Sequence, residues 1–525
     1  MTSPTQASGP APGRDSSAIT RRLRRRQWLI LAVVVVVAGA IARPGLHLLR
    51  MLLTDVDGRA VLPPGHVDDA SRLNQTRVAE VIDVSSDKAT AERQLAELLA
   101  RARREHQTIS VAGRRHSMGG QTFVPDGLTV NMLPLCAMTL DADNSRLHVE
   151  AGAVWADIIR HLDARGYSVA VMQSNNSFSV GGSLSVNCHG WQYGQPPIAS
   201  TVESFRLMKA DGEVVRCSRT ENAELFSLAL GGYGMFGILL DVELRVVPNR
   251  RYRLERFVVR SDEAFATFDD KIASRADAAM VYGRMNVSDK RFLDDVILCA
   301  FVDDPAADGS IPKLSDPGLT SLRRAVFRGS ADSDYGKEFR WTAETKLQTQ
   351  IAPTHYSRNQ LLNDGVEIFQ NRSADTTDIL HEYFLPRDGV EDFVVAMRRI
   401  IPAHHGNLLN VTVRAVEEDH DSFLRFADQR MLAFVMLFQQ PRSVAGDDAM
   451  QAMTRDLIDA ALSGGGRYYL PYRLHATPEQ FRAAYPQAAE FFRLKRHYDP
   501  DELFQNQFYK RYGQETSGDV GTQAN

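Results

Sequence analysis

TISVAGRRHSMGGQTFVPDGLTVNMLPL, residues 108–135, is the stretch of this sequence that says most about the fold. A run rich in β-branched residues ends at Gly113, and a second extended run covers residues 128–132. Between them lies a loop of glycine and small polar residues around His116. Glycine lets the backbone approach a ligand closely, and successive N–H groups in such a loop can surround a diphosphate. The stretch predicts a strand–loop–strand unit with an anion-binding loop; a surface turn with a solvated histidine is the alternative.

A second glycine-rich segment is SNNSFSVGGSLSVNCHG, residues 174–190. It lacks helical periodicity, so we expect a loop. Its serine and asparagine side chains supply short hydrogen-bonding groups beside Gly181 and Gly182. This segment therefore predicts a second loop suited to close contact with a ligand.

A third segment, LALGGYGMFGILLDVELRVVP at residues 228–248, contains a formal GxGxxG motif. A nicotinamide-binding motif of this kind needs a strand before the glycines and a helix after them. Here the order is reversed, because residues 220–230 predict a helix and residues 237–247 alternate as a strand. The sequence thus argues against a nicotinamide-binding Rossmann unit.

In this order, the three segments resemble the FAD-binding domain of the vanillyl-alcohol-oxidase family. Residues 146–166, a strand followed by a helix, and residues 498–513 also match it. The similarity covers roughly residues 70–250 and 475–513 and is nearest the aldonolactone/alditol oxidase and decaprenylphosphoryl-ribose oxidase branches. It implies an α+β fold, in which a two-subdomain FAD-binding domain carries a mixed α/β cap domain.

The resemblance implies FAD as the cofactor and assigns the residues that hold it. These are Gly113, Arg114, Arg115, His116, Ser117, Met118, Gly119, Gly120 and Gln121 in the first loop, Gly181, Gly182, Ser183, Asn187, His189 and Gly190 in the second, and Gly237, Ile238 and Asn506 beyond them. In the family, the histidine of a Gly-x-x-His-Ser loop is often bonded covalently to the flavin. We therefore expect a covalent bond through His116, with a noncovalent contact as the alternative.

Length, charge and cysteine content set broad limits. A chain of 525 residues is longer than a domain with a single hydrophobic core usually is, so we expect two domains behind a targeting segment. A net charge of −4 gives no reason to invoke nucleic acid as a partner. The four cysteines are widely spaced, with no CxxC pair and no companion histidines at metal-site spacing, which argues against a disulfide framework or a metal site.

The N-terminus predicts a membrane or export signal. Residues 1–27 form a basic segment that we expect to be disordered, and its arginines lead into the apolar run WLILAVVVVVAGAIA. By the positive-inside rule, an uncleaved anchor over residues 28–49 would hold the catalytic body on the non-cytoplasmic side of the membrane. The alternative is export after signal cleavage at an A-x-A site, residues 40–42.

The rest of the chain is expected to contain two domains. Strands and helices alternate over residues 70–250, the expected FAD-binding domain, starting with an amphipathic helix at residues 86–107. Residues 251–474 predict the cap or substrate domain, in which the insert 303–337 has the composition of a loop. Residues 475–513 are expected to return to the FAD-binding domain.

Two predicted strands of the cap carry candidate catalytic residues. Glu382 lies in HEYFLP, residues 381–386, and Arg414 lies at an alternating position of NVTVRAVEEDH, residues 410–420. Sugar- and polyol-oxidising members of the resembled family carry similar Glu-Tyr-x-x-Pro and Val-x-Arg strands, whose acid and arginine face the substrate. The resemblance therefore implies substrate contact for Glu382 and Arg414.

Two further candidates complete the catalytic set. GGGRYYLPYRLHAT, residues 464–477, resembles the segment of decaprenylphosphoryl-ribose oxidase that precedes a catalytic lysine, but Tyr472 stands at the place of that lysine. A phenol can donate a hydrogen bond but brings no positive charge. The arrangement in the relatives implies that His189 lies close to the flavin.

Together these features predict an FAD-dependent oxidoreductase that oxidises a CH–OH group of a sugar, sugar lactone or polyol by hydride transfer to flavin N5. The electrons would pass to oxygen or a membrane electron acceptor. Two alternatives stay open at this point: a flavin-dependent reductase that uses a nicotinamide donor, and a non-catalytic membrane-anchored binding protein on the same scaffold.

Overall fold

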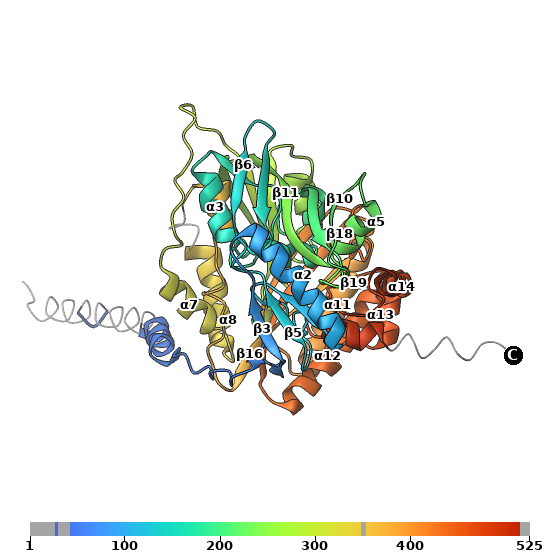
Figure 1. Ribbon diagram of the computed structural model, residues 1–525. Helices are drawn as coiled ribbons and strands as arrows, with labels where there is room; N and C mark the ends of the chain where they lie inside the picture. The colour runs from blue at the N-terminus through green and yellow to red at the C-terminus, as the bar shows by residue number, and fades with distance from the viewer. Residues whose placement is uncertain (1–26, 30–41, 348–352, 515–525) are drawn as a thin grey trace, which may run out of the picture. The chain divides into compact units, whose positions relative to one another are not determined.

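The computed structural model describes residues 27–29, 42–347 and 353–514 (Figure 1). By its internal contacts the chain divides into two compact units, residues 1–54 and residues 55–525.

Within the first unit, residues 42–54 form a helix. Much of the predicted anchor, residues 28–49, lies outside the described residues. Among the helices that are described, none combines the length and the apolar character needed to cross a membrane. The anchor therefore stays a prediction.

The second unit contains a small parallel sheet formed around the stretch 108–135. Its central strand pairs with a parallel strand on each side, and Leu95 and Leu99 of the preceding helix are buried against it. The elements are β3 (Glu80–Asp83), α2 (Lys88–Glu105), β4 (Ile109–Ala112) and β5 (Leu128–Asn131). Both the amphipathic helix and the strand–loop–strand unit that the sequence predicts are confirmed.

An antiparallel sheet follows, in the strand order β10-β9-β11-β7-β6, with β8 paired to the end of β11. Its elements are β6 (Met138–Asp141), β7 (Arg146–Glu150), α3 (Trp155–Asp163), β8 (Tyr167–Val169), α4 (Val180–Ser185), β9 (Val202–Met208), β10 (Val214–Ser218), α5 (Ala223–Ala229) and β11 (Ile238–Pro248). Helix α5 precedes the glycines of the GxGxxG motif and strand β11 follows them. The reversed order predicted for this motif is confirmed.

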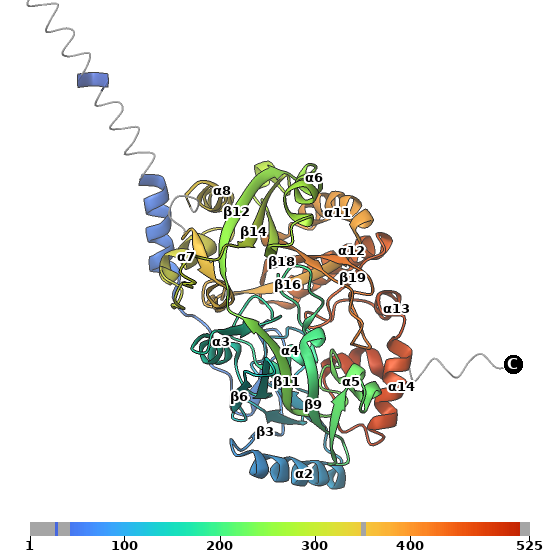
Figure 2. The same ribbon diagram turned by 90° about the horizontal axis from the view of Figure 1, so that it is seen from above.

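The third sheet has eight strands and is built from residues 251–468. In sheet order these are β15 (His355–Ser357), β12 (Arg251–Arg260), β14 (Asp295–Asp303), β13 (Ala278–Met285), β17 (Asn407–Val416), β18 (Met431–Pro441), β16 (Thr376–Leu385) and β19 (Arg467–Tyr468). The helices along it are α6 (Ala264–Phe268), α7 (Thr320–Arg328), α8 (Asp334–Thr342), α10 (Arg358–Leu362), α11 (Val390–Ala403) and α12 (Val444–Ser463). Figure 2 shows this sheet on one side of the unit and the two smaller sheets on the other.

Helix α12 packs against one face of β16 and leaves the other face to the half that contains the two smaller sheets. His381 of β16 contacts Thr454 of α12. Because successive residues of a strand point to opposite faces, Glu382 points away from α12. The catalytic candidate therefore faces the glycine-rich loops.

The C-terminal segment returns to the first sheet through α13 (Pro478–Ala484) and α14 (Ala488–Tyr498). The backbone N–H of Ile109 donates to the carbonyl of Leu503 over 2.7 Å, and Gln505 N–H donates back to Ile109 over 3.0 Å. The chain end thus extends the edge of β4, directly before the first loop.

The structure contradicts two expectations of loop structure. Residues 174–190 contain the short helix α4, and the insert 303–337 contains α7 and the start of α8. In α7 the buried residues include Arg324 and Arg328, which pair with Asp55 and Asp378. Arginine at a buried position breaks the apolar periodicity by which a helix is recognised.

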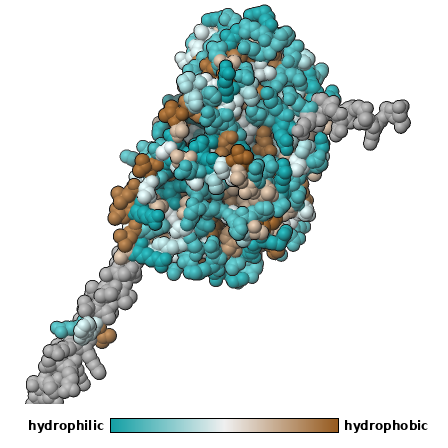
Figure 3. Space-filling model, turned by 90° about the horizontal axis from the view of Figure 1, so that it is seen from below, coloured by the Kyte–Doolittle hydropathy of each residue, from teal (hydrophilic) through white to brown (hydrophobic). Residues whose placement is uncertain are grey.

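The surface shown in Figure 3 is mainly hydrophilic, with apolar residues in small patches. Exposed large apolar residues of the second unit include Val258, Val395 and Val444, which lie on or beside different elements. Single apolar residues of this kind are ordinary on a globular surface.

A fully buried ion pair closes the C-terminal return and can be tested directly. Lys495 Nζ lies 2.9 Å from the Asp499 carboxylate, and the two side chains are 0% and 1% exposed. Removing one partner leaves the other charge buried alone, so Asp499→Ala is expected to lower the free energy of unfolding by about 3–5 kcal/mol. Urea denaturation measures this change.

The matched control is Glu490→Ala, which removes an exposed ion pair with Arg493 on the same helix. We expect it to change the free energy of unfolding by less than about 1 kcal/mol. Equal effects of the two substitutions would contradict a structural role for the buried pair.

Candidate functional site

The loop after β4 presents backbone N–H groups that the protein itself does not use. Within the described part of the chain, the N–H groups of residues 114–117 meet no hydrogen-bond acceptor. Arg115 has a φ of 55°, a left-handed conformation that non-glycine residues adopt rarely and that is frequent at functional sites. Successive free N–H groups around a left-handed residue form a concavity suited to an anion.

The far half of the same loop is held firmly. Gly120 N–H donates to the buried Asp69 carboxylate over 2.9 Å, and Met118 N–H donates to the carbonyl of Pro471 over 2.8 Å. Gln121 accepts from Gly119 N–H and donates to the carbonyl of Leu470. The free N–H groups are thus presented by a loop anchored at its far end.

The second loop lies directly against the first. The His116 ring stacks on the Phe178 ring with centroids 4.1 Å apart. A Cβ atom at Gly113 would come within 2.0 Å of Ser179 Oγ and 3.1 Å of Ser179 Cβ, so the two loops approach closely here. The two glycine-rich segments that the sequence singled out therefore form one continuous surface.

Several polar side chains predicted to hold the cofactor also form hydrogen bonds within the protein. Ser183 bonds Trp155 and Gln173, and Asn187 bonds Asp419 and Ser422. Asn506 donates to the carbonyl of Tyr233 and accepts from Tyr509 N–H, and Gln121 is engaged as described above. These hydrogen bonds shape the loops, and contact of the four side chains with the cofactor stays a prediction.

Gly237 and Ile238 have a similar supporting role. A Cβ atom at Gly237 would meet the carbonyl oxygen of Met208 at 2.5 Å, and Ile238 is buried where β11 pairs with β9. At Gly190, a Cβ atom would meet the carbonyl oxygen of Met172 at 2.1 Å. At these positions the glycine requirement comes from the packing of the chain on itself.

The loops fit the FAD that the family resemblance implies. The free N–H groups at residues 114–117 suit a diphosphate, and at Gly182 a Cβ atom would meet Ser179 Oγ at 3.1 Å, so the backbone of the second loop lies close to Ser179. His116 is half-buried, and burial lowers the pKa of its imidazole to about 4. The imidazole is therefore uncharged at neutral pH and keeps a nitrogen lone pair, as a bond to a flavin requires.

Above these loops, three side chains from distant parts of the sequence form one buried hydrogen-bonded chain. His189 Nε2 lies 2.5 Å from one carboxylate oxygen of Glu382, and the Tyr472 hydroxyl donates to the other over 3.0 Å. Glu382 and His189 are 3% and 5% exposed, whereas Tyr472 is half-buried. Tyr472 is therefore the member of this chain that a substrate can reach.

Arg414 supplies the positive charge beside this chain. The register of β17, β18 and β16 places Arg414 opposite Ala433 and Phe384, two residues along from Glu382. Burial acts to raise the pKa of the Glu382 carboxyl, but His189, Arg414 and the Tyr472 hydroxyl outweigh it and lower the pKa. Burial and the neighbouring Glu382 raise the pKa of Tyr472 well above its ordinary value. The acid is thus ionised and the phenol protonated at neutral pH.

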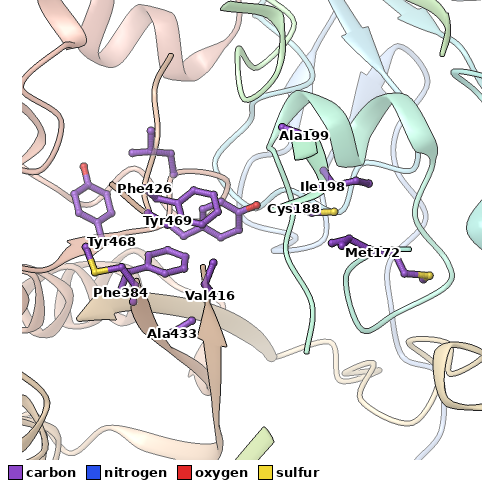
Figure 4. Packing of buried hydrophobic residues seen from close by; sticks show 14 of the residues in the cluster. Met172, Cys188, Ile198, Ala199, Phe384, Val416, Phe426, Ala433, Tyr468 and Tyr469 are labelled. Atoms are coloured by element: carbon purple, nitrogen blue, oxygen red, sulfur yellow. The ribbon is translucent and has the colours of Figure 1, made fainter. Parts of the chain in front are cut away.

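Aromatic rings shield the buried pair from water. Phe384, Phe426 and Tyr469 surround the His189 ring at centroid distances of 5.4, 5.7 and 6.0 Å. Figure 4 shows Phe384, Phe426 and Tyr469 packed together on one side and Cys188 on the other. Burial raises the pKa of the Cys188 thiol to about 12, so this cysteine stays protonated and unreactive.

All four predicted catalytic candidates thus lie in one place, and the segment that carries Tyr472 also contacts the first loop. A Cβ atom at Gly119 would meet the carbonyl oxygen of Tyr472 at 2.4 Å. The sequence analysis missed Asp69, a buried acid in what appears in the sequence as a polar connector. It also missed Gln192, which is buried with both amide atoms lacking partners. Neither belongs to a motif with a recognisable spacing.

Comparison with known proteins supports FAD as the cofactor of these loops. Residues 87–218 match the family model described as FAD binding domain, and residues 335–512 match the one described as D-arabinono-1,4-lactone oxidase. The second match includes Glu382, Arg414 and Tyr472.

Relatives of two kinds are found among characterised proteins. Cytokinin dehydrogenase 2 of Arabidopsis thaliana is 34% identical over 148 residues, 28% of this chain and 30% of that protein. L-gulonolactone oxidase of Mus musculus is 31% identical over 153 residues, 29% of this chain and 34% of that protein. Cytokinin dehydrogenase 4 of Oryza sativa subsp. japonica is 22% identical over 428 residues, 75% of this chain and 78% of that protein.

The stronger of these similarities span about a third of each relative's length. Nevertheless, the two family matches occur in the expected order, and the loops fit FAD. Both observations indicate an FAD-dependent oxidoreductase. The chain belongs to the vanillyl-alcohol-oxidase-type family of FAD-dependent oxidoreductases.

Proposed function

We propose that this protein oxidises a CH–OH group of a sugar, sugar lactone or polyol with FAD as its cofactor. The observation that carries the proposal is the buried chain of His189, Glu382 and Tyr472 beside Arg414. The three cap residues of this group fall within the match to the lactone oxidase model. An electron acceptor, either oxygen or a membrane carrier, completes the proposed reaction.

Oxidation of an alcohol to a carbonyl removes one hydride from carbon and one proton from oxygen. Bound FAD supplies the acceptor for the hydride. The substrate hydroxyl donates a hydrogen bond to Tyr472 Oη and loses its proton to that atom. Tyr472 passes its own proton along the 3.0 Å hydrogen bond to Glu382, whose other oxygen is held by His189.

Arg414 orients the substrate in this scheme. Its guanidinium donates no hydrogen bond to any described residue, so its N–H groups are available to substrate oxygens. A positive charge there also stabilises negative charge that develops on the oxygen as its proton leaves. Phe384 and Tyr469 keep water from Glu382, which strengthens these electrostatic interactions.

We also propose that His116 bonds covalently to the flavin and that residues 28–49 anchor the protein in a membrane, with the catalytic body on the non-cytoplasmic side. The first proposal is supported by the neutral imidazole in the loop that suits the diphosphate. The second is supported by the arginines that precede the apolar run.

Tyr472→Phe and Glu382→Gln test the proton path. Each removes one proton-transferring atom, so we expect the rate constant for flavin reduction by a sugar or polyol to fall about a hundredfold or more, while bound flavin is retained. Stopped-flow absorbance under anaerobic conditions measures this rate. As a control, Tyr167→Phe removes a phenol that only bonds the carbonyl of Ala142 and should leave the rate unchanged.

The proton-path assignment fails if both variants reduce flavin at the wild-type rate. A flavin that no sugar or polyol bleaches, but that NADPH bleaches rapidly, would instead favour the nicotinamide-dependent reductase. A purified protein without flavin would contradict the enzymatic proposal as a whole.

His116→Ala tests the covalent bond. Acid-denatured wild-type protein is expected to keep yellow flavin fluorescence in its band on a denaturing gel, and the variant to lose it. His161→Ala, which changes a histidine of α3, should keep the fluorescence. Release of flavin from the wild-type protein would reduce His116 to a noncovalent contact.

Membrane fractionation tests the anchor. The full chain is expected to stay in the membrane pellet after alkaline carbonate washing, because an apolar span resists extraction. A chain that starts at residue 55, where the second compact unit begins, should be released. Release of both would contradict the anchor.

A further inference from the structure

The strand register continues the substrate-facing row beyond the catalytic group. Glu382 of β16 pairs with Val435 of β18, Val435 pairs with Thr412 of β17, and Thr412 pairs with Arg284 of β13. Directly paired residues of an antiparallel sheet point to the same face. Arg284 therefore shares the face of Glu382, three strand spacings or roughly 14 Å away.

Arginines gather along this part of the face. The same register places Tyr282 opposite Arg414, while Tyr282 pairs with Cys299, and Cys299 pairs with Arg256. We call Arg256, Arg284 and Arg414 the cationic band. Arg340 and Glu344 reach it from α8 and the turn after it.

Among the described residues, carboxylates balance only part of the positive charge of the band. Glu344 accepts from Arg340 over 2.8 Å and lies 3.6 Å from Arg284. The second carboxylate on this face is Glu382, which is bonded to His189 and Tyr472 and lies beside Arg414. Four guanidinium groups, those of the band and of Arg340, thus face two carboxylates, Glu344 and Glu382, among the described residues.

The hydrogen-bonding capacity of the band is only partly used. Arg256 Nη1 donates to the carbonyl of Glu344 over 3.3 Å, and Arg284 Nη1 donates to Asn410 Oδ1 over 2.8 Å. Arg340 is satisfied by Glu344, the carbonyl of Leu409 and Asn410. By contrast, the Nε atoms of Arg256 and Arg414 are buried and have no partner in the described chain. A buried N–H group without an acceptor is costly, so these two atoms are suited to an acceptor that a ligand supplies.

An unpartnered amide lies on the same face. Gln192, from the end of the second loop, pairs with Met280 of β13, two residues before Tyr282. Its side chain is 3% exposed, and neither Nε2 nor Oε1 has a partner among the described residues. A buried amide in this state is suited to hydrogen bonds with hydroxyl groups of a ligand.

We infer that the substrate carries an anionic group, a carboxylate or a phosphate, which binds at the cationic band while its reacting hydroxyl lies at Tyr472. This rests on the proposed oxidation of a polyhydroxy substrate and narrows it to acidic sugars. Arginine binds carboxylate and phosphate through paired N–H groups, which neutral polyols do not match. The band thus selects the substrate at one end and Glu382 deprotonates it at the other, by way of Tyr472.

Three probes of similar carbon chain test this inference on the flavin-loaded full-length protein: D-gluconate, D-sorbitol 6-phosphate and uncharged D-sorbitol. Quenching of tryptophan fluorescence under anaerobic conditions reports binding, because Trp191 packs 5.3 Å from Tyr282. At low salt we expect at least one anionic probe to bind about tenfold more tightly than sorbitol. Which anionic probe binds better distinguishes a carboxylate site from a phosphate site.

Arg256→Gln and Arg284→Gln are each expected to remove most of this preference and to leave sorbitol affinity unchanged. Arg253→Gln is the matched control, since this exposed arginine lies on the same strand as Arg256 but on the opposite face. If either variant is unstable, the salt dependence of the wild-type affinities tests the inference instead. The affinity for the anionic probes should fall with added salt, whereas the affinity for sorbitol should not.

Equal affinity for the three probes, or a preference unaffected by both substitutions, would overturn the inference. If sorbitol still bleaches the flavin in that case, the proposed oxidation stands without the anionic group. If no probe binds and none bleaches the flavin, the proposed function fails together with the inference.

Discussion

The buried carboxylate of Glu382 is the constraint on which the site depends. It comes from the eight-stranded sheet, is held by His189 from the second glycine-rich loop, and accepts from Tyr472 on the segment that precedes the C-terminal return. An ionised acid at 3% exposure is stable only with such partners. The three parts of the chain must therefore dock in one arrangement, and the carboxylate joins the cap to the FAD-binding half.

The same docking sets the shape of the cofactor loops. Main-chain atoms of residues 470–472 bond Met118 and Gln121, and the space at Gly119 is too small for a side chain. Asp69 holds Gly120 from the other side. Because the segment that positions Tyr472 also braces this loop, the Tyr472 phenol and the first glycine-rich loop share one rigid support. That sharing suits chemistry in which a hydride and a proton leave one substrate in opposite directions.

Local patterns were enough to predict much of the fold. The amphipathic spacing of residues 86–107, the alternation of residues 237–247 and the β-branched run before Gly113 each correspond to the expected element. Prediction failed where buried charge replaced apolar periodicity, as at Arg324 and Arg328 in α7. It also failed for α4, a helix of six residues that is too short for a periodic signal.

The sequence by itself was enough to predict the two glycine-rich loops. Glycine spacing is a local property, so it can be recognised without knowing how the rest of the chain folds. The sequence also named Glu382, Arg414, Tyr472 and His189, though only through family resemblance. The tertiary structure alone decided that Asn187 and Asn506 brace loops, and that Arg256 and Arg284 share a face with Glu382. Strand register and hydrogen-bond partners join residues far apart in sequence, so no local pattern could reveal them.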